Sequence, residues 1–325
     1  MKAILCRKLG GPEMLELAEV AEPKPGSGEV LVRVAVVGLN FFDTLMLSGK
    51  YQFRPELPFS PGAECAGRIE AVGEGVTQWR VGERVAAFPG HGCCRERITL
   101  HAERLLRIPD GVTDEQAAGL IVTYGTSLHA LKDRARLKAG ETLAVLGAAG
   151  GVGLAAVEIG HAMGARVIAC ASSADKLQLA AAHGADLTLD YAARDVKEGL
   201  RALTDGRGAD VIYDPVGGDL AEPALRAIAW QGRYLVVGFA AGAIPKIPLN
   251  LALLKGCDIQ GVFWGSFVER EPATHRANMD QIFAWTKEGR LSAHVHHVFP
   301  LAETASALGV LARREAKGKV LVKVG

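Results

Sequence analysis

The segment PGAECAG, residues 61–67, places a carboxylate, Glu64, directly before a thiol, Cys65. Both are metal-ligand types, and a catalytic zinc site needs three such ligands from separate segments together with an open coordination position. The rest of the chain must therefore show whether other ligands accompany this pair.

Two other groups of ligand-type residues are less informative. His294, His296 and His297 lie in AHVHHVF, where the first two would point to the same side of a strand, but no third ligand converges with them. We interpret them as a solvated face rather than a metal site. Adjacent cysteines rarely close a ring without strain, so we interpret Cys93-Cys94 as ordinary packed or surface thiols rather than a redox pair.

The most informative stretch is LAVLGAAGGVGLAAVEIG, which predicts a strand, a glycine turn and a helix. The residues Gly150, Gly151, Val152 and Gly153 would begin the helix, where free N–H groups and the helix dipole favour an anion. Glycine lets a pyrophosphate approach the backbone closely. The spacing departs from a strict GxGxxG, because Ala148 stands in place of its first glycine, but the βαβ context favours dinucleotide binding over a tight structural turn.

The residues after the second strand of this unit indicate which dinucleotide binds. Proteins selective for NAD place an acidic residue there, whereas this chain has Ser172 and Ser173, followed by Lys176, and Tyr191 ends the third strand. A 2′-phosphate would find donors and no repelling carboxylate, so we expect NADPH. The alternative is that Asp175 binds the ribose and Lys176 is a solvated helix residue.

These motifs belong to two architectures in succession. Up to about residue 108 the apolar runs are short, rich in strand formers and separated by Gly and Pro, which predicts a β-rich domain. A helix capped by Thr113 or Asp114 follows, and then five strands alternate with four helices. That alternation predicts a doubly wound parallel sheet of the Rossmann type, so the fold class is α/β. The sheet's helices are expected over 151–163, 194–203 and 220–230 among others, with a sixth strand at 259–263 and a C-terminal tail that rejoins the first domain.

The composition of the chain limits the classes of partner that we expect it to bind. The chain has 325 residues, enough for two domains, and 37 basic against 36 acidic residues leave a formal net charge of +1, so nucleic acid and acidic membranes are not expected. The first residues do not resemble a secretory signal, and no apolar stretch is long enough for a membrane span. Six cysteines without a CxxC pair fit a reducing cytoplasm, where we expect the protein to act on a small molecule.

Several motifs together resemble the zinc-independent NADPH:quinone oxidoreductase (zeta-crystallin-like) family of the medium-chain dehydrogenase/reductase superfamily. They span nearly the whole chain and include GLNFFDTLMLSGKYQFRPELPFSPGAECAG, TYGTSLHAL, LGAAGGVG, YDPVGG and KGKVLVKV. The resemblance implies a GroES-like catalytic domain formed by residues 1–121 and 265–325, and a Rossmann NADP(H)-binding domain formed by residues 122–264.

The resemblance also bears on the possible metal site. Zinc alcohol dehydrogenases of this superfamily have a cysteine in the segment that matches GLNFFD and a GHE triplet where this chain has GAE. Asn40 and Ala63 stand at those places, so two ligand positions carry an amide and a methyl group. We therefore expect no metal, and we interpret Glu64 as a buried or backbone-bonded structural carboxylate and Cys65 as a packed residue.

The resemblance implies catalytic roles for Asn40, Asp43 and Tyr51. Asn40 would bond the nicotinamide ribose or the acceptor oxygen, Tyr51 would donate a phenolic hydrogen bond, and Asp43 would orient its neighbours rather than transfer a proton. In the alternative, Asn40 and Asp43 cap a helix over 41–47 and Tyr51 is a packing aromatic.

Further cofactor contacts come from the resemblance alone. Thr126 would lie at a nucleotide-contacting turn and helix start, Phe239 at the end of a strand, Phe263 against the nicotinamide, and Arg314 near the phosphates. Their alternative is ordinary core packing or solvated charge. The segment LALLKGCDIQGVFWG, residues 251–265, suggests a homodimer by analogy with the edge-to-edge pairing of the family.

The function implied is metal-free reduction of quinones by NADPH. The closest alternative is an enoyl thioester or enone reductase of the same superfamily, which would differ only in its acceptor pocket. A second alternative, from another class, is an NADPH-binding structural protein with little turnover.

Overall fold

The computed structural model describes all 325 residues, which form two compact units. The first comprises Met1–Val122 and Met279–Gly325, and the second comprises Thr123–Asn278. Residues 265–278, which the sequence placed with the first domain, group with the second unit. The reason is local packing: the Phe267 ring stacks on His129 with centroids 3.8 Å apart, and Asn278 donates to the Asp133 carboxylate at 2.8 Å.

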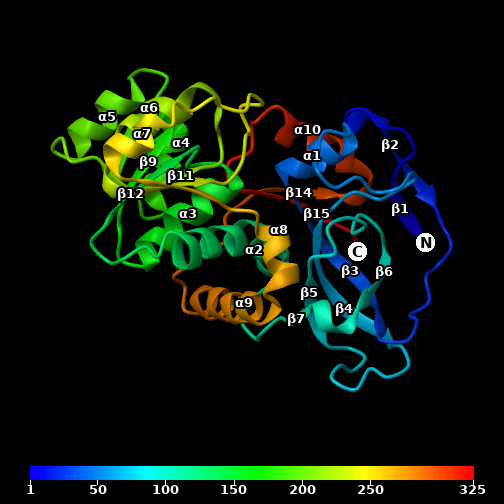
Figure 1. The fold of residues 1–325 in the computed structure, drawn as a ribbon. Helices are drawn as coiled ribbons and strands as arrows, with labels where there is room; N and C mark the ends of the chain where they lie inside the picture. The colour runs from blue at the N-terminus through cyan, green and yellow to red at the C-terminus, as the bar shows by residue number, and fades with distance from the viewer. The chain divides into compact units, whose positions relative to one another are not determined.

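The first unit is mainly β-structure (Figure 1). Its main sheet has seven strands in the order β14-β15-β3-β4-β5-β7, with β6 paired to β3, while β1 and β2 form a separate antiparallel pair. Its strands are β1 (Lys2–Cys6), β2 (Leu15–Glu19), β3 (Glu29–Leu39), β4 (Glu64–Val72), β5 (Arg84–Ala87), β6 (Arg97–His101), β7 (Leu105–Arg107), β14 (Val295–Pro300) and β15 (Lys319–Lys323); its helices are α1 (Phe41–Leu47) and α10 (Thr304–Ala312).

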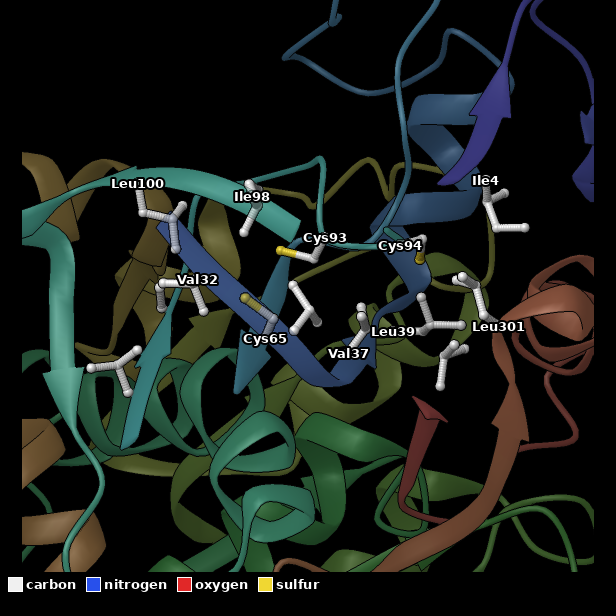
Figure 2. Packing of buried hydrophobic residues seen from close by; sticks show 14 of the residues in the cluster. Ile4, Val32, Val37, Leu39, Cys65, Cys93, Cys94, Ile98, Leu100 and Leu301 are labelled. Atoms are coloured by element: carbon white, nitrogen blue, oxygen red, sulfur yellow. The ribbon is translucent and has the colours of Figure 1, made fainter. Parts of the chain in front are cut away.

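The long strand β3 organises this unit because it pairs with β4, β6 and β15. Val32 and Val37 of β3 pack into the core together with Cys65 of β4 (Figure 2), and Ile69 of β4 belongs to the same cluster. The two valines share the core although they lie five residues apart, because the register of β3 against β4 shifts between Val34 and Val36. Strand β15 returns the C-terminus to this sheet, with Val320 opposite Leu39 and Val322 opposite Val37. The expected return of the tail is therefore made by backbone pairing.

The second unit has a six-stranded, fully parallel sheet in the order β10-β9-β8-β11-β12-β13. This confirms the doubly wound fold that the alternation predicted. Its strands are β8 (Thr142–Leu146), β9 (Arg166–Ala171), β10 (Leu187–Asp190), β11 (Ala209–Asp214), β12 (Ile228–Val236) and β13 (Asp258–Gly261); its helices are α3 (Gly151–Ala162), α4 (Ala174–Ala182), α5 (Val196–Leu203), α6 (Ala221–Arg226), α7 (Asn250–Lys255) and α8 (Trp264–Arg270).

Helices cover both faces of this sheet. Leu200 of α5 and Leu225 of α6 pack with Ala144 and Ile168 of the strands. The opposite face carries Leu143 and Val167, and α3 approaches it closely at Gly160, where an added Cβ would lie 2.5 Å from a Leu143 methyl. Glycine at position 160 therefore permits the close packing of helix on sheet.

The chain positions at which the two units divide, 122/123 and 278/279, lie within two long helices, α2 (Asp114–Leu128) and α9 (Pro272–Lys287). Thr113 caps α2: its hydroxyl accepts from the Gln116 N–H at 3.1 Å, and the Gln116 side chain accepts from the Thr113 N–H at 3.0 Å. Directly after α2 comes a π-helical turn, His129–Arg134. Short 3-10 turns cover Pro12–Met14, Ala102–Arg104, Gly218–Leu220 and Leu301–Glu303.

One predicted helix is shorter than expected. A helix over 220–230 was expected, but α6 ends at Arg226, and Ile228 already pairs with Ala209 in the parallel ladder. The residues 227–230, AIAW, have helical propensity, but sheet pairing overrides it. The backbone N–H and C=O groups of this segment find hydrogen-bond partners on β11 instead. No helix in the chain combines the length and the apolar character needed to cross a bilayer.

Candidate functional site

The glycine turn lies at the carboxyl end of β8, where the chain changes direction across the sheet. Strand β8 has β9 on one side and β11 on the other, and doubly wound sheets bind ligands at this kind of position. Gly147 has φ +61°, which favours glycine, and a Cβ on Gly153 would lie only 2.1 Å from the Gly147 carbonyl oxygen. The turn therefore requires glycine at both positions to join strand and helix.

Gly150 has a different environment. It is the N-cap of α3, has φ −74°, and a Cβ added there would meet nothing nearer than the Gly147 oxygen at 3.5 Å. Side-chain space beside it is open, so an anion can approach the first N–H groups of α3, which have no partner within the helix. The predicted residues Gly150, Gly151, Val152 and Gly153 thus form one continuous helix start that fits a phosphate group.

Tyr191 and Ser172, two of the residues predicted to select the dinucleotide, come together. Tyr191 follows β10, and its N–H donates to the Ala171 carbonyl oxygen at 3.0 Å, which brings it beside Ser172. Ser173 is the N-cap of α4 and its hydroxyl donates to Asp175, which ties that carboxylate to the helix start. A hollow of 310 Å³ opens at the same edge of the sheet. It is lined by Tyr191, Arg194, Asp195, Val196, Asp219, Leu220 and neighbouring residues, and not by Ser172, Ser173 or Lys176.

A buried carboxylate that sequence reasoning missed holds the turn after β11. Asp214 is 3% exposed and accepts from the N–H groups of Val216 and Gly217, both at 2.8 Å, and from the Tyr234 hydroxyl. Burial raises its pKa above the ordinary range, and these hydrogen bonds oppose that rise. Phe239, a predicted cofactor residue, lies against Gly217, so the YDPVGG motif fixes the position of that ring.

Three other predicted cofactor residues, Thr126, Phe263 and Arg314, lie on other elements than the glycine turn and the strand ends described above. Thr126 is buried in the last turn of α2, not at the start of a helix, because α2 continues to Leu128. Phe263 is the N-cap residue of α8 and is 59% exposed. Arg314 is an exposed residue of the first unit with φ +59°, in the turn that ends α10.

The first unit contains a buried polar cluster around Glu64. The Glu64 side chain is fully buried and accepts from the Val122 N–H at 2.8 Å, from the Asn40 amide at 2.8 Å and from the Lys319 ammonium at 2.5 Å. Lys319, which is 4% exposed, also donates to Asn40 Oδ1 at 2.6 Å. Gly38 makes room for the cluster, since a Cβ there would lie 2.8 Å from Glu64 Oε1. Glu64 is therefore a buried, backbone-bonded carboxylate, as the sequence indicated.

Asp43 and Tyr51 lie near this cluster on and after α1. Asp43 is fully buried; its Oδ2 accepts from the Asn40 N–H at 2.7 Å, while its Oδ1 has no hydrogen-bond partner. Burial raises the pKa of Asp43 to about 7, with the Asn40 N–H and Lys319 acting in the opposite direction. Tyr51 is half-buried and stacks on Phe42 with ring centroids 5.2 Å apart. Burial, together with the Asp43 charge, raises the pKa of the Tyr51 phenol.

The residues around Glu64 do not fit a zinc ion. The Glu64 oxygens accept hydrogen bonds from the Lys319 ammonium, the Asn40 NH₂ group and the Val122 N–H. These three groups face Glu64 as donors, so none of them can serve as a second metal ligand beside it. No three His, Cys, Asp or Glu side chains in the chain gather closely enough to hold a metal ion, and His296 and His297 are strand residues of β14.

The cysteines near the cluster are packed residues. Cys65 and Cys93 lie side by side in the core of the first unit, with Cys94 next to them (Figure 2). All six cysteines are free and buried. Burial raises the pKa of the Cys93 and Cys94 thiols well above the ordinary value, which makes them poor nucleophiles. This agrees with their interpretation as packed thiols.

Comparison with known proteins places both units in one family. Residues 26–110 match the alcohol dehydrogenase GroES-like domain, and residues 151–282 match the zinc-binding dehydrogenase family model. The chain is 38% identical to a quinone oxidoreductase-like protein 2 homolog from Nematostella vectensis, over 99% of this chain and 88% of that protein. It is 37% identical to a quinone oxidoreductase from Pseudomonas aeruginosa, over 99% of both chains.

A solved structure supports the same family. The Escherichia coli quinone oxidoreductase complexed with NADPH superposes with a TM-score of 0.94 at 28% identity, covering 100% of both chains. The chain therefore belongs to the quinone oxidoreductase family of the medium-chain dehydrogenase/reductase superfamily.

Proposed function

We propose that this oxidoreductase reduces quinones with NADPH and without a metal ion. The observation that carries the proposal is the pairing of an open phosphate cradle at Gly150 with the hydroxyl-bearing strand end at Ser172 and Ser173, where the Ser173 hydroxyl is bonded to Asp175. Support also comes from the NADPH complex of the Escherichia coli relative and from the names of the quinone oxidoreductase relatives.

In this proposal the second unit holds the cofactor, which supplies a hydride when bound. The N–H groups at the start of α3 bind its pyrophosphate. Ser172, Ser173, Lys176 and Tyr191 surround the 2′-phosphate, where a charge-assisted hydrogen bond contributes about 1.5–3 kcal/mol. The Asp214 carboxylate holds the 215–218 turn, against which Phe239 packs, so the position of this ring depends on hydrogen bonds within the chain.

The first unit supplies hydrogen-bond donors and aromatic surface. Asn40 donates one N–H to Glu64 and accepts from Lys319 through Oδ1, so its second N–H remains as a donor. The Tyr51 hydroxyl is a second donor. Donors of this kind stabilise negative charge that develops on an acceptor oxygen, but they polarise it less than a metal does. An acceptor that takes hydride readily, such as a quinone, therefore suits this site best.

Reduction of a conjugated enone or enoyl thioester is the second candidate. The same donors would serve the oxygen of such an acceptor, so the choice depends on measured turnover. The test is NADPH oxidation with 1,4-benzoquinone, 9,10-phenanthrenequinone, an enone and crotonyl-CoA under identical conditions. We expect the quinones to give the highest kcat/KM. If no acceptor accelerates NADPH oxidation while NADPH still raises the Tm, the protein is an NADPH-binding structural protein instead.

We also propose that the protein is a homodimer and acts in the cytoplasm. Strand β13 is the last strand of its sheet, and the adjoining α7 exposes Leu253 by 80% and Leu254 by 66%, next to Trp230, which is 69% exposed. A second copy placed edge to edge would cover this apolar face and pair the free strand edge. Six free cysteines support a reducing compartment.

A further inference from the structure

The buried ammonium of Lys319 is not explained by the fold alone. Lysine is among the residues least often buried, yet Lys319 is 4% exposed at the start of β15, a strand that is otherwise apolar up to Lys323. Burying an ion pair is weak evidence of stabilisation, because desolvation offsets much of the attraction between the charges. Strand β15 pairs with β3 through backbone groups, so the sheet itself does not require an ammonium at position 319.

Lys319 contacts the one predicted catalytic amide. Its Nζ donates to Asn40 Oδ1 at 2.6 Å and to Glu64 Oε1 at 2.5 Å, and Glu64 Oε1 accepts from Asn40 Nδ2 at 2.8 Å. These three bonds close a ring in which the ammonium is bonded to the amide oxygen and the carboxylate to the amide nitrogen. Reversing the amide would place its NH₂ group against the ammonium and its oxygen against the carboxylate. The ring therefore permits only one orientation of Asn40.

We propose that Lys319 is a positioning residue of the reductase site: with Glu64 it fixes the orientation of the Asn40 amide. The inference rests on the proposed function, because it assigns Asn40 its role toward the cofactor or acceptor.

Asp43 is linked to the ring by its Oδ2, which accepts from the Asn40 N–H, while its buried Oδ1 is left without a partner. The charged groups that act on it are Lys319 of β15, which lowers its pKa, and Glu64 of β4, which raises it. Titratable groups on other segments that sense the Asp43 charge are the Tyr51 phenol and the Cys93 and Cys94 thiols. Lys319 is the only cation among these groups. Its removal leaves two acidic groups, Asp43 and Glu64, without a compensating positive charge.

The test compares Lys319→Met with Lys323→Met, an exposed lysine on the same strand. We expect Lys319→Met to lower kcat for quinone reduction by about 10- to 100-fold, the equivalent of one charged hydrogen bond, with KM for NADPH changed by about twofold or less. The double variant Glu64→Gln/Lys319→Met removes both charges and therefore protects the fold. Its kcat should stay low because Asn40 is still not fixed. Full recovery of kcat in the double variant would overturn the proposal, since it would show that Lys319 only neutralises Glu64.

A second readout does not depend on activity. The side-chain amide ¹H–¹⁵N resonances of Asn40, assigned by their loss in Asn40→Asp, should move in Lys319→Met and stay in place in Lys323→Met. Unmoved Asn40 resonances in Lys319→Met contradict the proposal. If the wild type reduces no quinone, the proposed function fails, and these resonances still decide whether Lys319 orients the Asn40 amide.

Discussion

Two alanine substitutions in the glycine turn should differ in effect: Gly153→Ala should mainly lower stability, and Gly150→Ala should mainly weaken cofactor binding. At Gly153 an added Cβ would lie 2.1 Å from the Gly147 oxygen and 2.8 Å from its carbonyl carbon, both backbone atoms that cannot turn aside. We expect Gly153→Ala to lower the free energy of unfolding by about 3 kcal/mol, the upper end of the usual range for overpacking. At Gly150 the nearest atom would be 3.5 Å away, so Gly150→Ala should cost about 1 kcal/mol or less.

NADPH binding should be sensitive to the substitution at Gly150. The methyl group of Gly150→Ala would occupy the open space beside the α3 N-terminus, and NADPH affinity should fall at least about tenfold, the equivalent of one charge-assisted hydrogen bond. Urea unfolding gives the stabilities, and quenching of protein fluorescence by NADPH gives the Kd. A Gly150→Ala protein that is stable and binds NADPH as tightly as the wild type would refute the assignment of this turn as the phosphate cradle.

Four further predictions concern single residues. Lys176→Ala should lower the ratio of kcat/KM for NADPH over NADH by about tenfold or more; an unchanged ratio would remove Lys176 from 2′-phosphate recognition. Tyr51→Phe should lower kcat at unchanged NADPH affinity, whereas an unaltered rate would leave Tyr51 as a packing aromatic. The pKa of Asp43 is raised by burial to about 7, above its unfolded value, so its contribution to stability is full below about pH 4 and is lost as the pH rises towards 7. Urea midpoints at pH 5 and pH 8 should therefore differ less in Asp43→Asn than in the wild type, and an equal difference would contradict the raised pKa. Leu253→Asp should convert a dimer to a monomer in sedimentation, while Val81→Asp, which changes a residue that is 62% exposed in the first unit, should not; a dimer that survives Leu253→Asp would exclude this face.

Much of the fold could be predicted because local signals agree with it. The parallel sheet follows from the alternation of strands and helices, and α3 begins at Gly151 as expected, directly after a turn that needs glycine at positions 147 and 153. The helix expected over 220–230 was wrong at its end, since Ile228 gains ladder hydrogen bonds on β11 that local propensity cannot reveal. Residues 265–278 group with the second unit through side-chain contacts of Phe267 and Asn278, which have no signature in the sequence.

The candidate site could be predicted in part. Asn40 and Asp43 are proposed from the resemblance of their segment, but Lys319, which bonds to Asn40, is 279 residues away from it along the chain. The only sequence signal for Lys319 was its position directly before the apolar run VLV, where a lysine at the end of a strand is usually exposed. Asp214 was missed for a similar reason: its role depends on the turn that folds back onto it.

The central claim is that hydrogen-bond donors, without a Lewis acid, suffice for hydride delivery to a quinone. The direct measurement is NADPH oxidation with 9,10-phenanthrenequinone on one preparation before and after exhaustive chelation, with the zinc content determined in both samples. We predict turnover that is equal in the two samples and independent of zinc content. Loss of turnover on chelation, together with one zinc ion per chain in the untreated protein, would contradict the account.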